Sequence, residues 1–425
     1  MAFVALSLEG RDSKIMNSKY ILDTQENRDF LKKETLELLR FGTKFPSPKG
    51  GSYYLSADGS PMMERPRETW ITSRMAHVYS IGAMLGVSGA RELAAKAING
   101  LLMGELRDKE NGGWYAGIAA DGSVLPTKQC YAHAFVILAG TSGYLAGIEG
   151  AKELLDEALL TYDKYFWNEE EGLSCDTYST DFSELDPYRG LNANMHTVEA
   201  FLAVADALND DGYRQRAGRI IDRVAQWAKD NDYRIPEHFN SSWEPQLELN
   251  KEKPDDPFKP YGATPGHGIE WARLITQWAM SHGEVYGRDA KAYIDFAEKL
   301  FDRAIEDAWN ADGARGICYT TDWNGRPVVH DRMHWTLAEA INTCSLFARL
   351  TGKEKYKTLY SELMKYLDEC VIDHKAGSWF HQLDEHNNLK ETVWPGKSDL
   401  YHAFQATLIP YSQIDVSIAK AVKER

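Results

Sequence analysis

The sequence predicts an all-α protein, an (α/α)6 barrel in which six helix pairs close into a toroid. Short aromatic-rich segments that end in Gly, Asp or Asn recur about every 60 residues, and such regular repetition indicates a repeat architecture. The intervals between them have the apolar spacing of helices, with room for two helices of about 12–18 residues each. An open solenoid is the alternative, but its repeats are usually shorter, about 33–47 residues.

The recurring segments are predicted β-hairpins, because alternating aromatic residues closed by Gly, Asp or Asn are typical of hairpin turns. They span residues 51–59, 113–122, 172–181, 233–243, 316–325 and 377–386. The fourth interval is longer than the others and contains a loop rich in Pro and Asp, from Asn250 to Pro265.

Helices fill the intervals. The first helix of a pair has an inward apolar face, as in residues 70–79, 196–208 and 335–346,. The second helices are predicted over residues 90–103, 151–165, 213–229, 289–308 and 354–370. Since no low-complexity linker separates the pairs, we predict one catalytic domain over residues 16–425. Residues 1–15 are predicted to be a flexible leader or extension, with Met16 as the natural start.

Composition and charge exclude several functions. Lys and Arg number 48 against 63 Asp and Glu, a net charge of −15, so the chain repels phosphate backbones and anionic membranes. No apolar run approaches the ~18–20 residues that cross a bilayer. The five cysteines are scattered without a CxxC pair, which argues against a disulfide scaffold or zinc ribbon. We therefore expect a cytoplasmic protein with no nucleic-acid or membrane partner.

Polar and aromatic side chains gather where the first helix of each pair begins. The clusters are Trp70/Arg74, Tyr131/His133, Asn192/Asn194/His196, His267/Glu270/Arg273, His334/Trp335/Glu339 and Asp399/Tyr401/His402. Helix caps alone do not explain them, because caps are Ser, Thr, Asp and Asn rather than His, Arg and Trp. One cluster per repeat at the same phase predicts a ligand site at one mouth of the toroid.

Three histidines in these clusters indicate proton transfer. They are His196, His267 and His402. A histidine side chain has an ordinary pKa near ~6.5, so it can give and take a proton at neutral pH. Glu270 follows His267 by three residues on the same helical face, so its carboxylate is expected to orient that imidazole. Hydrolysis by paired carboxylates remains an alternative, with Glu199, Glu270 and Glu339 as candidates.

Metal and cofactor chemistry fit the sequence less well. His330 and His334 are four residues apart, but no matched third metal ligand accompanies them,. No GxGxxG or GxSxG motif occurs in the context that it requires, and the segment 391–398 lacks the first Gly of a phosphate-binding loop,. We expect no metal and no cofactor.

The segments 70–80, 192–201, 264–271 and 394–402 resemble the N-acylglucosamine 2-epimerase superfamily. Within it, they are most similar to the aldose–ketose isomerase branch of D-mannose isomerases and sulfoquinovose isomerases. The similarity runs from about Met16 to Pro410 and implies the same (α/α)6 barrel. It also implies metal-free interconversion of an aldose and its ketose through a cis-enediol.

The resemblance further implies residue roles. His267 would move hydrogen between C2 and C1, His402 would open the pyranose ring, and Glu270 would orient and polarise the histidine pair. The positions implied to bind the sugar are Arg74, Tyr131, Asn192 and His196 at its oxygens, Trp70, Trp335 and Trp394 as aromatic neighbours, and His381 on the last hairpin.

Two positions differ from those of the sulfoquinovose isomerases, and the difference bears on the substrate. Sulfoquinovose isomerases carry glutamines where this chain has His381 and Ser398, so a neutral monosaccharide is favoured over a sulfonate. We predict interconversion of D-mannose and D-fructose, together with D-lyxose and D-xylulose. The alternatives are a 2-epimerase of mannose/glucose or of a reducing disaccharide, a sulfoquinovose isomerase, and a non-catalytic sugar-binding barrel.

Overall fold

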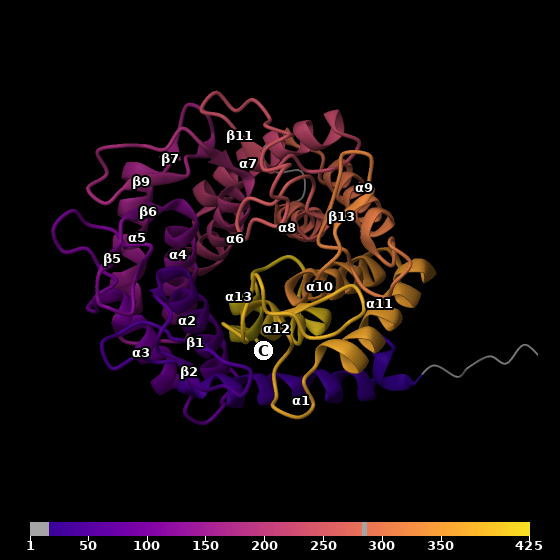
Figure 1. Ribbon diagram of the computed structural model, residues 1–425, viewed down its shortest axis with the longest axis horizontal. Helices are drawn as coiled ribbons and strands as arrows, with labels where there is room; N and C mark the ends of the chain where they lie inside the picture. Colours follow the sequence, from indigo (N-terminus) through magenta and orange to yellow (C-terminus); the bar gives the residue numbers. More distant parts are fainter. Residues whose placement is uncertain (1–16, 283–286) are drawn as a thin grey trace, which may run out of the picture.

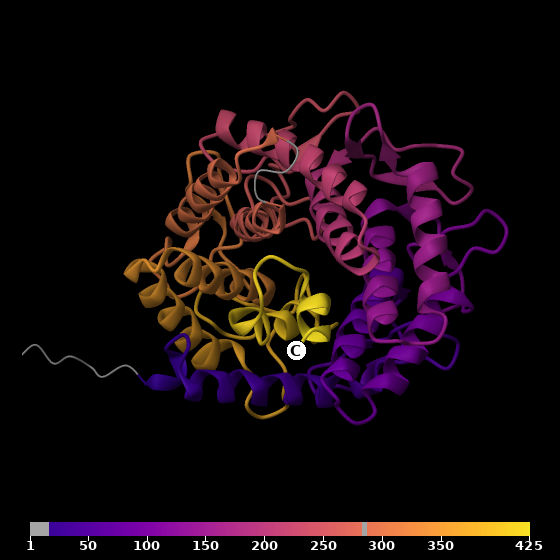
Figure 2. The same cartoon turned by 180° about the vertical axis from the view of Figure 1, so that it is seen from behind.

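Two concentric rings of helices make up the molecule. The computed structural model describes residues 17–282 and 287–425, so the predicted leader over residues 1–15 lies outside the described residues. Figures 1 and 2 show the ring from its two ends. The outer helices are α1 (Gln25–Phe41), α3 (Ala90–Leu102), α5 (Ala151–Tyr165), α7 (Asp211–Asp230), α9 (Ala290–Ala308) and α11 (Glu354–Tyr366).

Each outer helix is paired with an inner one. The inner helices are α2 (Thr69–Met84), α4 (Cys130–Leu145), α6 (Leu191–Leu208), α8 (Pro265–His282), α10 (His334–Thr351) and α12 (Tyr401–Ala406). The predicted (α/α)6 barrel is confirmed. The least accurate helix prediction is 354–370, where α11 ends at Tyr366 and a π-helical turn continues to Val371. The last inner helix, α12, is unusually short, and the chain beyond it runs inside the ring to α13 (Ile418–Lys423).

The two rings differ because their helices meet different surroundings. Outer helix α7 has a single apolar stripe, formed by Ala217, Ile220, Ile221, Val224, Ala225 and Ala228. Inner helix α4 is buried along almost its whole length, because it packs against neighbours on several sides,. Gly140 lets α4 approach α5 closely, since a Cβ there would lie 2.9 Å from the backbone nitrogen of Leu155.

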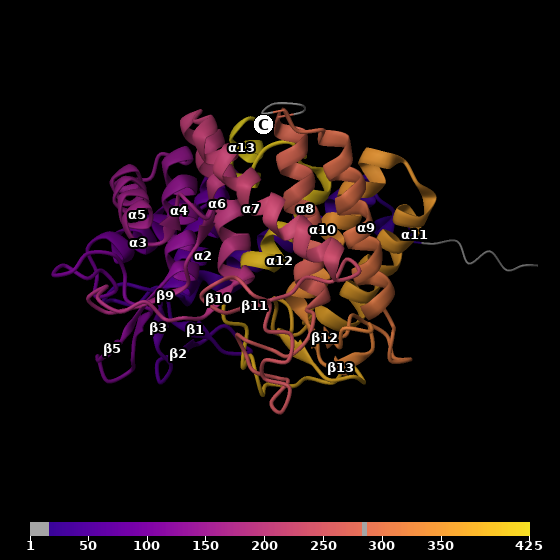
Figure 3. The same cartoon turned by 90° about the horizontal axis from the view of Figure 1, so that it is seen from above.

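Short antiparallel strands gather at one end of the toroid, as Figure 3 shows. Local hairpins pair β1 (Tyr54–Leu55) with β2 (Pro61–Met62), β4 (Gly117–Ile118) with β5 (Val124–Leu125), β7 (Trp167–Asn168) with β8 (Leu173–Ser174), and β12 (Thr320–Thr321) with β13 (Pro327–Val329). Other pairs join neighbouring repeats: β3 (Arg67–Glu68) with β4, β6 (Thr127–Gln129) with β9 (Thr177–Ser179), β10 (Arg189–Gly190) with β11 (His238–Phe239), and β14 (Arg332–Met333) with β15 (Gln382–Leu383).

The hairpin prediction was partly wrong in its pairing. The segment 172–181 divides between β8 and β9, which pair with different strands. In 233–243 and 377–386, the strands β11 and β15 pair with the preceding repeat, and their own hairpins close through single bridges, Phe239 with Pro245 and Leu383 with Leu389. The residues of a turn predict pairing within one hairpin, but they do not indicate which strand of another repeat will pair with it. Their pairing ties adjacent repeats together around the mouth.

No helix in the described ranges combines the length and the apolar character needed to cross a membrane. The prediction of a cytoplasmic location stays a prediction.

Candidate active site

A cavity opens at the strand-bearing end of the toroid, where the inner helices begin. It encloses about 660 Å³ of empty space, part of which is open to solvent. Every residue to which the family resemblance gave a catalytic or sugar-binding role lines it: His267, His402, Glu270, Arg74, Tyr131, Asn192, His196, Trp335, Trp394, Trp70 and His381. The repeat phase brings most of these residues together, because they lie at the starts of the inner helices. His381 instead precedes β15, and Trp394 lies in the loop between β15 and α12.

His402 and His267 each contact a buried carboxylate. Nδ1 of His402 donates a hydrogen bond to Oε1 of Glu339 at 3.0 Å, and Nδ1 of His267 lies 3.0 Å from Oε2 of Glu237. Both histidines line the cavity. The bond to Glu339 leaves Nε2 of His402 for a ligand,, whereas Nδ1 of His267 is close to Glu237 without forming a hydrogen bond. The expectation that Glu270 orients His267 differs from this arrangement, in which Glu237 and Glu339 contact the imidazoles.

Sequence reasoning missed Glu237 as a site residue. It precedes β11, in a segment predicted only as a hairpin, and no helical spacing links it to His267. The strand pair β10–β11 places Glu237 beside the start of α6, where its carbonyl accepts the backbone N–H of Leu191. Only this tertiary pairing brings Glu237 to the mouth.

A third histidine–glutamate pair completes the set. Nδ1 of His196 lies 3.1 Å from Oε2 of Glu199, one turn further along α6. Burial lowers the pKa of His196 to about 4, despite the carboxylate. The imidazole of His196 is therefore neutral at physiological pH.

Glu270 occupies the space between these pairs. Arg273 Nη2 lies 3.4 Å from Glu270 Oε1, and Arg273 Nε donates to Glu339 Oε2 at 2.8 Å. Burial and the neighbouring Glu339 raise the pKa of Glu270 well above its ordinary value. Burial also raises the pKa of Glu339, but Arg273 and His402 more than offset that effect. These shifts favour a protonated Glu270 beside an ionised Glu339,.

Burial likewise lowers the pKa of His402, although its bond to Glu339 opposes the shift. A neutral imidazole with Nδ1–H donated to a carboxylate exposes the lone pair of Nε2. That arrangement is suited to a general base.

Arg74 supplies a fixed cation to the cavity. Its guanidinium donates to Asp399 Oδ2 at 3.2 Å and to the Tyr131 hydroxyl at 2.8 Å. It lies over the Trp70 ring at 4.7 Å from the ring centroid. These contacts hold Arg74 in one orientation, so its charge is preorganised.

Aromatic rings form the rest of the wall. Trp335 lies 5.0 Å from His267 and 5.8 Å from His402, measured between ring centroids. Phe258, from the long Asn250–Pro265 loop, is half-exposed and contacts Trp394 at 5.6 Å. Trp70 and Trp394 meet edge to face at 6.2 Å.

Several polar atoms at the wall are free to bind a ligand. Among the described residues, Asn192 Oδ1, His334 Nε2, His381 Nε2 and Trp394 Nε1 are buried without a protein hydrogen-bond partner. His334 and His381 stack at 3.8 Å between centroids. Burial lowers the pKa of His334 to about 3, and that of His381 well below its ordinary value. This wall therefore offers neutral hydrogen-bonding groups.

Two members of the predicted clusters serve the scaffold. His133 Nε2 accepts the backbone N–H of Trp114, and its Nδ1 donates to the carbonyl of Gln129. The amide of Asn194 bonds to the backbone of Ser174 on β8. Both side chains join a helix start to a neighbouring strand segment rather than lining the cavity.

The structure places His330 and His334 in different surroundings. His330 lies before β14 and bonds to Asp312, whereas His334 begins α10 and lines the cavity. Asp312 also binds the guanidinium of Arg332. Inside the cavity, Glu270 and Glu339 come close enough to His402 to share an ion, but Arg273 already contacts both carboxylates. A fixed cation there repels a metal ion.

The fold and this cavity define an (α/α)6 barrel with a site lined by histidine, glutamate and aromatic side chains, and comparison with known proteins identifies a family of sugar isomerases and epimerases. The profile of the N-acylglucosamine 2-epimerase family matches residues 50–406. The chain belongs to this family.

Individual relatives fall within the isomerase branch. The chain is 40% identical to a D-mannose isomerase of Pseudomonas cannabina pv. alisalensis over 365 residues, covering 86% of this chain and 88% of that protein. It is 38% identical to a D-mannose isomerase of Thermobifida fusca over 402 residues, covering 93% and 97%. A crystal structure of a D-mannose isomerase matches with a TM-score of 0.82 at 26% identity, covering 90% of this chain and 97% of that one.

The fold is shared more widely. The structure of cellobiose 2-epimerase from Spirochaeta thermophila DSM 6192 matches with a TM-score of 0.78 at 19% identity, covering 92% of this chain and 97% of that one. At this identity the likeness supports the fold alone.

Proposed function

We propose that the chain is an aldose–ketose isomerase that interconverts D-mannose and D-fructose through a cis-enediol, without a metal ion. The observation that carries this proposal is the pair His267 and His402, which face one cavity and each have Nδ1 against a buried glutamate. Relatives at 38–40% identity named D-mannose isomerase support the choice of sugar. The pentoses D-lyxose and D-xylulose share the reacting end and are proposed as further substrates.

The steps use these two imidazoles as general acids and bases. Nε2 of His402 opens the pyranose ring by taking the O1 proton and returning a proton to O5. Nε2 of His267 then takes the C2 proton and delivers it to C1, while the O2 hydroxyl loses its proton and the C1 carbonyl oxygen gains one. General acid–base groups of this kind typically contribute ~10²–10⁴-fold to the rate.

Glu270 and Arg74 stabilise the enediol between these steps. The uncharged carboxyl of Glu270 can donate a hydrogen bond to an oxygen that gains negative charge,. Arg74 is held by Asp399 and Tyr131, so it adds positive charge without reorganising during the reaction,.

The wall at His381 favours a neutral sugar. His381 and Ser398 adjoin each other at 3.4 Å, and the pKa of His381 is depressed by burial and by nearby cations and histidines. A sulfonate at this point would meet an uncharged imidazole, whereas a hydroxyl can use its free Nε2,.

A 2-epimerase acting on mannose and glucose is the second candidate. It is favoured by the same two imidazoles, which could act on both faces of C2. Following mannose in D₂O by NMR separates the two functions, because a 2-epimer that forms before any ketose indicates epimerisation.

The test of the main proposal is incubation with D-mannose in EDTA, with fructose followed by ¹³C NMR. We expect fructose at the same rate with and without the chelator. Failure to form a ketose would refute the isomerase assignment, and loss of activity in EDTA would refute metal independence alone.

A further inference from the structure

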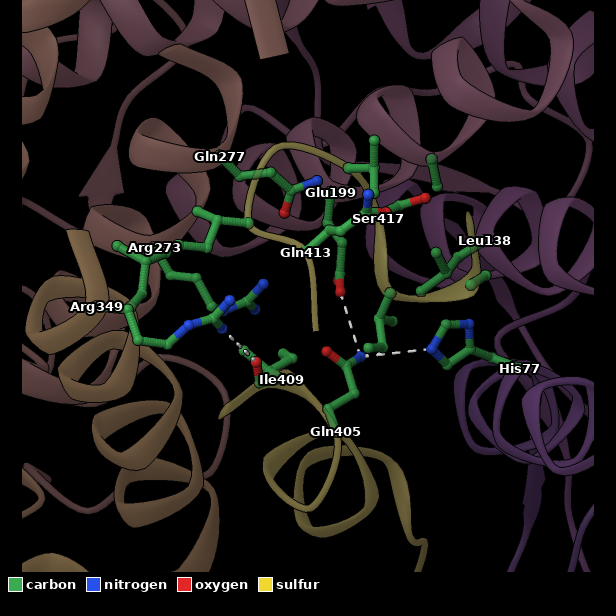
Figure 4. Close-up of a pocket in the computed structure, with 16 residues that line it drawn as sticks. His77, Leu138, Glu199, Arg273, Gln277, Arg349, Gln405, Ile409, Gln413 and Ser417 are labelled. Atoms are coloured by element: carbon green, nitrogen blue, oxygen red, sulfur yellow. Dashed lines mark hydrogen bonds between the residues drawn. The ribbon is translucent and has the colours of Figure 1, made fainter. Parts of the chain in front are cut away.

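A second cavity lies behind the active site, toward the end of the toroid opposite the strands. It encloses about 610 Å³ of empty space, part of it open to solvent. We call it the rear chamber. Figure 4 shows its lining, which includes Gln277 from α8 and Gln413 and Ser417 from the C-terminal segment. Gln413 is exposed, so the chamber reaches the surface.

One layer of side chains separates the rear chamber from the sugar cavity. Each member of this layer follows a cavity residue by three positions on the same inner helix, and that spacing keeps both on one helical face. The pairs are Arg74 and His77, His196 and Glu199, Glu270 and Arg273, and His402 and Gln405.

The layer is polar and connects the two sides. Glu199 faces the rear chamber and accepts hydrogen bonds from Tyr401 and from Gln405 Nε2. On its other side, Glu199 meets Nδ1 of His196 at 3.1 Å. Figure 4 shows the Gln405 amide nitrogen between Glu199 and His77. Within the described chain, Gln405 Oε1 is a buried acceptor without a hydrogen-bond partner.

Glu270 extends this connection to the catalytic pair. One ligand-type atom from each of His196, Glu199 and Glu270 lies within 4.8 Å of the other two. The same holds for Glu270, Glu339 and His402. A small side-chain rotation or one bridging water covers such a gap. Labile hydrogens can therefore pass from Glu199 through Glu270 to His402.

We propose that water in the rear chamber exchanges its hydrogens with the catalytic residues through Glu199 while a sugar fills the front cavity. The chamber is partly open to solvent, and its buried polar groups can hold water molecules,. A solvent hydrogen enters at Glu199 as an active-site hydrogen leaves, so no net charge moves. This inference rests on the proposed function only in taking the front cavity as the sugar site.

The test measures hydrogen exchange at the imidazoles directly. Protein labelled with ¹⁵N-histidine and saturated with D-mannitol, an open-chain polyol, is transferred to D₂O, and NMR follows loss of the Nδ1–H signals of His196 and His402. Ala419→Leu fills the chamber from α13, where Ala419 is buried and lies outside the lining of the front cavity. We expect exchange at least tenfold slower than in the wild type.

Matched variants separate filling of the chamber from general disturbance. Ala421→Leu places the same side chain on α13 at a buried position outside the chamber lining, and should exchange at the wild-type rate. Ala203→Leu, on α6, fills the chamber from another element, so the test does not depend on one variant folding. Unchanged exchange in both filled variants would overturn the proposal.

Activity is read separately from exchange. Fructose formation from mannose reports the proposed function, and the filled variants should retain it within about twofold, because the front cavity is untouched. Absence of fructose with slowed exchange would refute the isomerase assignment but support hydrogen exchange through the rear chamber. Normal turnover with unchanged exchange would support the isomerase assignment but refute exchange through the chamber.

Discussion

Nδ1 of His402 donates a hydrogen bond to Glu339, although the two residues lie on different inner helices, α12 and α10. Glu339 is fully buried and also accepts from Arg273. The glutamate therefore fixes the tautomer of His402, and Arg273 keeps the glutamate ionised. The six-residue helix α12 holds His402 in place through this contact with its longer neighbour α10.

Glu339→Gln should lower kcat/KM about 10²-fold, the low end of a general acid–base contribution. The amide cannot hold His402 as an anion does. The substitution also removes an interaction that raises the pKa of His402. The pKa of His402 should therefore fall, and the acid limb of the pH–rate profile should move to lower pH. Steady-state kinetics from pH 5 to 8 measure both effects. Glu37→Gln, in an exposed ion pair with Arg40, should leave them unchanged.

Replacing each catalytic histidine by alanine should separate their roles. His402→Ala should lose turnover of cyclic mannose but retain slow C2–H exchange on the small open-chain fraction. His267→Ala should lose both, because no base then faces C2. Each loss should be about 10²–10⁴-fold. Deuterium incorporation at C2 distinguishes the variants, and equal, complete loss of exchange in both would contradict the assignment.

Acid should destabilise the fold through its buried neutral histidines. Burial lowers the pKa of His133 to about 3, whereas the unfolded value is near ~6.5. Between these values the unfolded chain binds a proton that the folded chain does not, so stability falls as the pH falls below 6.5. At pH 5, His133 alone should cost about 2 kcal/mol, taking ~1.4 kcal/mol per pKa unit.

His133→Gln provides the comparison, since an amide can accept the Trp114 N–H and does not titrate. Urea unfolding at pH 8 and pH 5 should show a stability difference about 2 kcal/mol smaller in the variant than in the wild type. An equal difference in both proteins would exclude His133 as a source of acid sensitivity.

Gly140→Ala should destabilise the protein by ~1–3 kcal/mol, because the new methyl would press on the backbone of Leu155 at 2.9 Å,. Gly268→Ala is the control within another inner helix, where the nearest atom, Ala304 Cβ, lies at an ordinary 3.4 Å. That change should be neutral or stabilising by up to about 1 kcal/mol, because alanine favours the helix. Thermal unfolding of both variants tests the difference.

The sequence predicted the barrel and most of the cavity lining because both follow from a repeat, whereas Trp394 and His381 were implied only by the family resemblance. Each repeat carries one cluster at the same position. When the six helix pairs close into a ring, the six clusters therefore meet at one end of it. The same regularity located His196, His267 and His402. His133 and Asn194 shared this phase, yet their side chains bond to neighbouring strand segments, since phase along a helix does not determine which neighbour a side chain meets.

What the sequence by itself determined is thus the ring and the level within it at which each proposed catalytic residue lies. The tertiary structure decided which carboxylate contacts which histidine: Glu237 reaches His267 through strand pairing, and Glu339 reaches His402 across two helices. It also decided the charge of Glu270, which depends on burial and on Glu339. The physical reason is that spacing along a helix is a local property, whereas hydrogen bonds between repeats and desolvation depend on the packing of the closed ring.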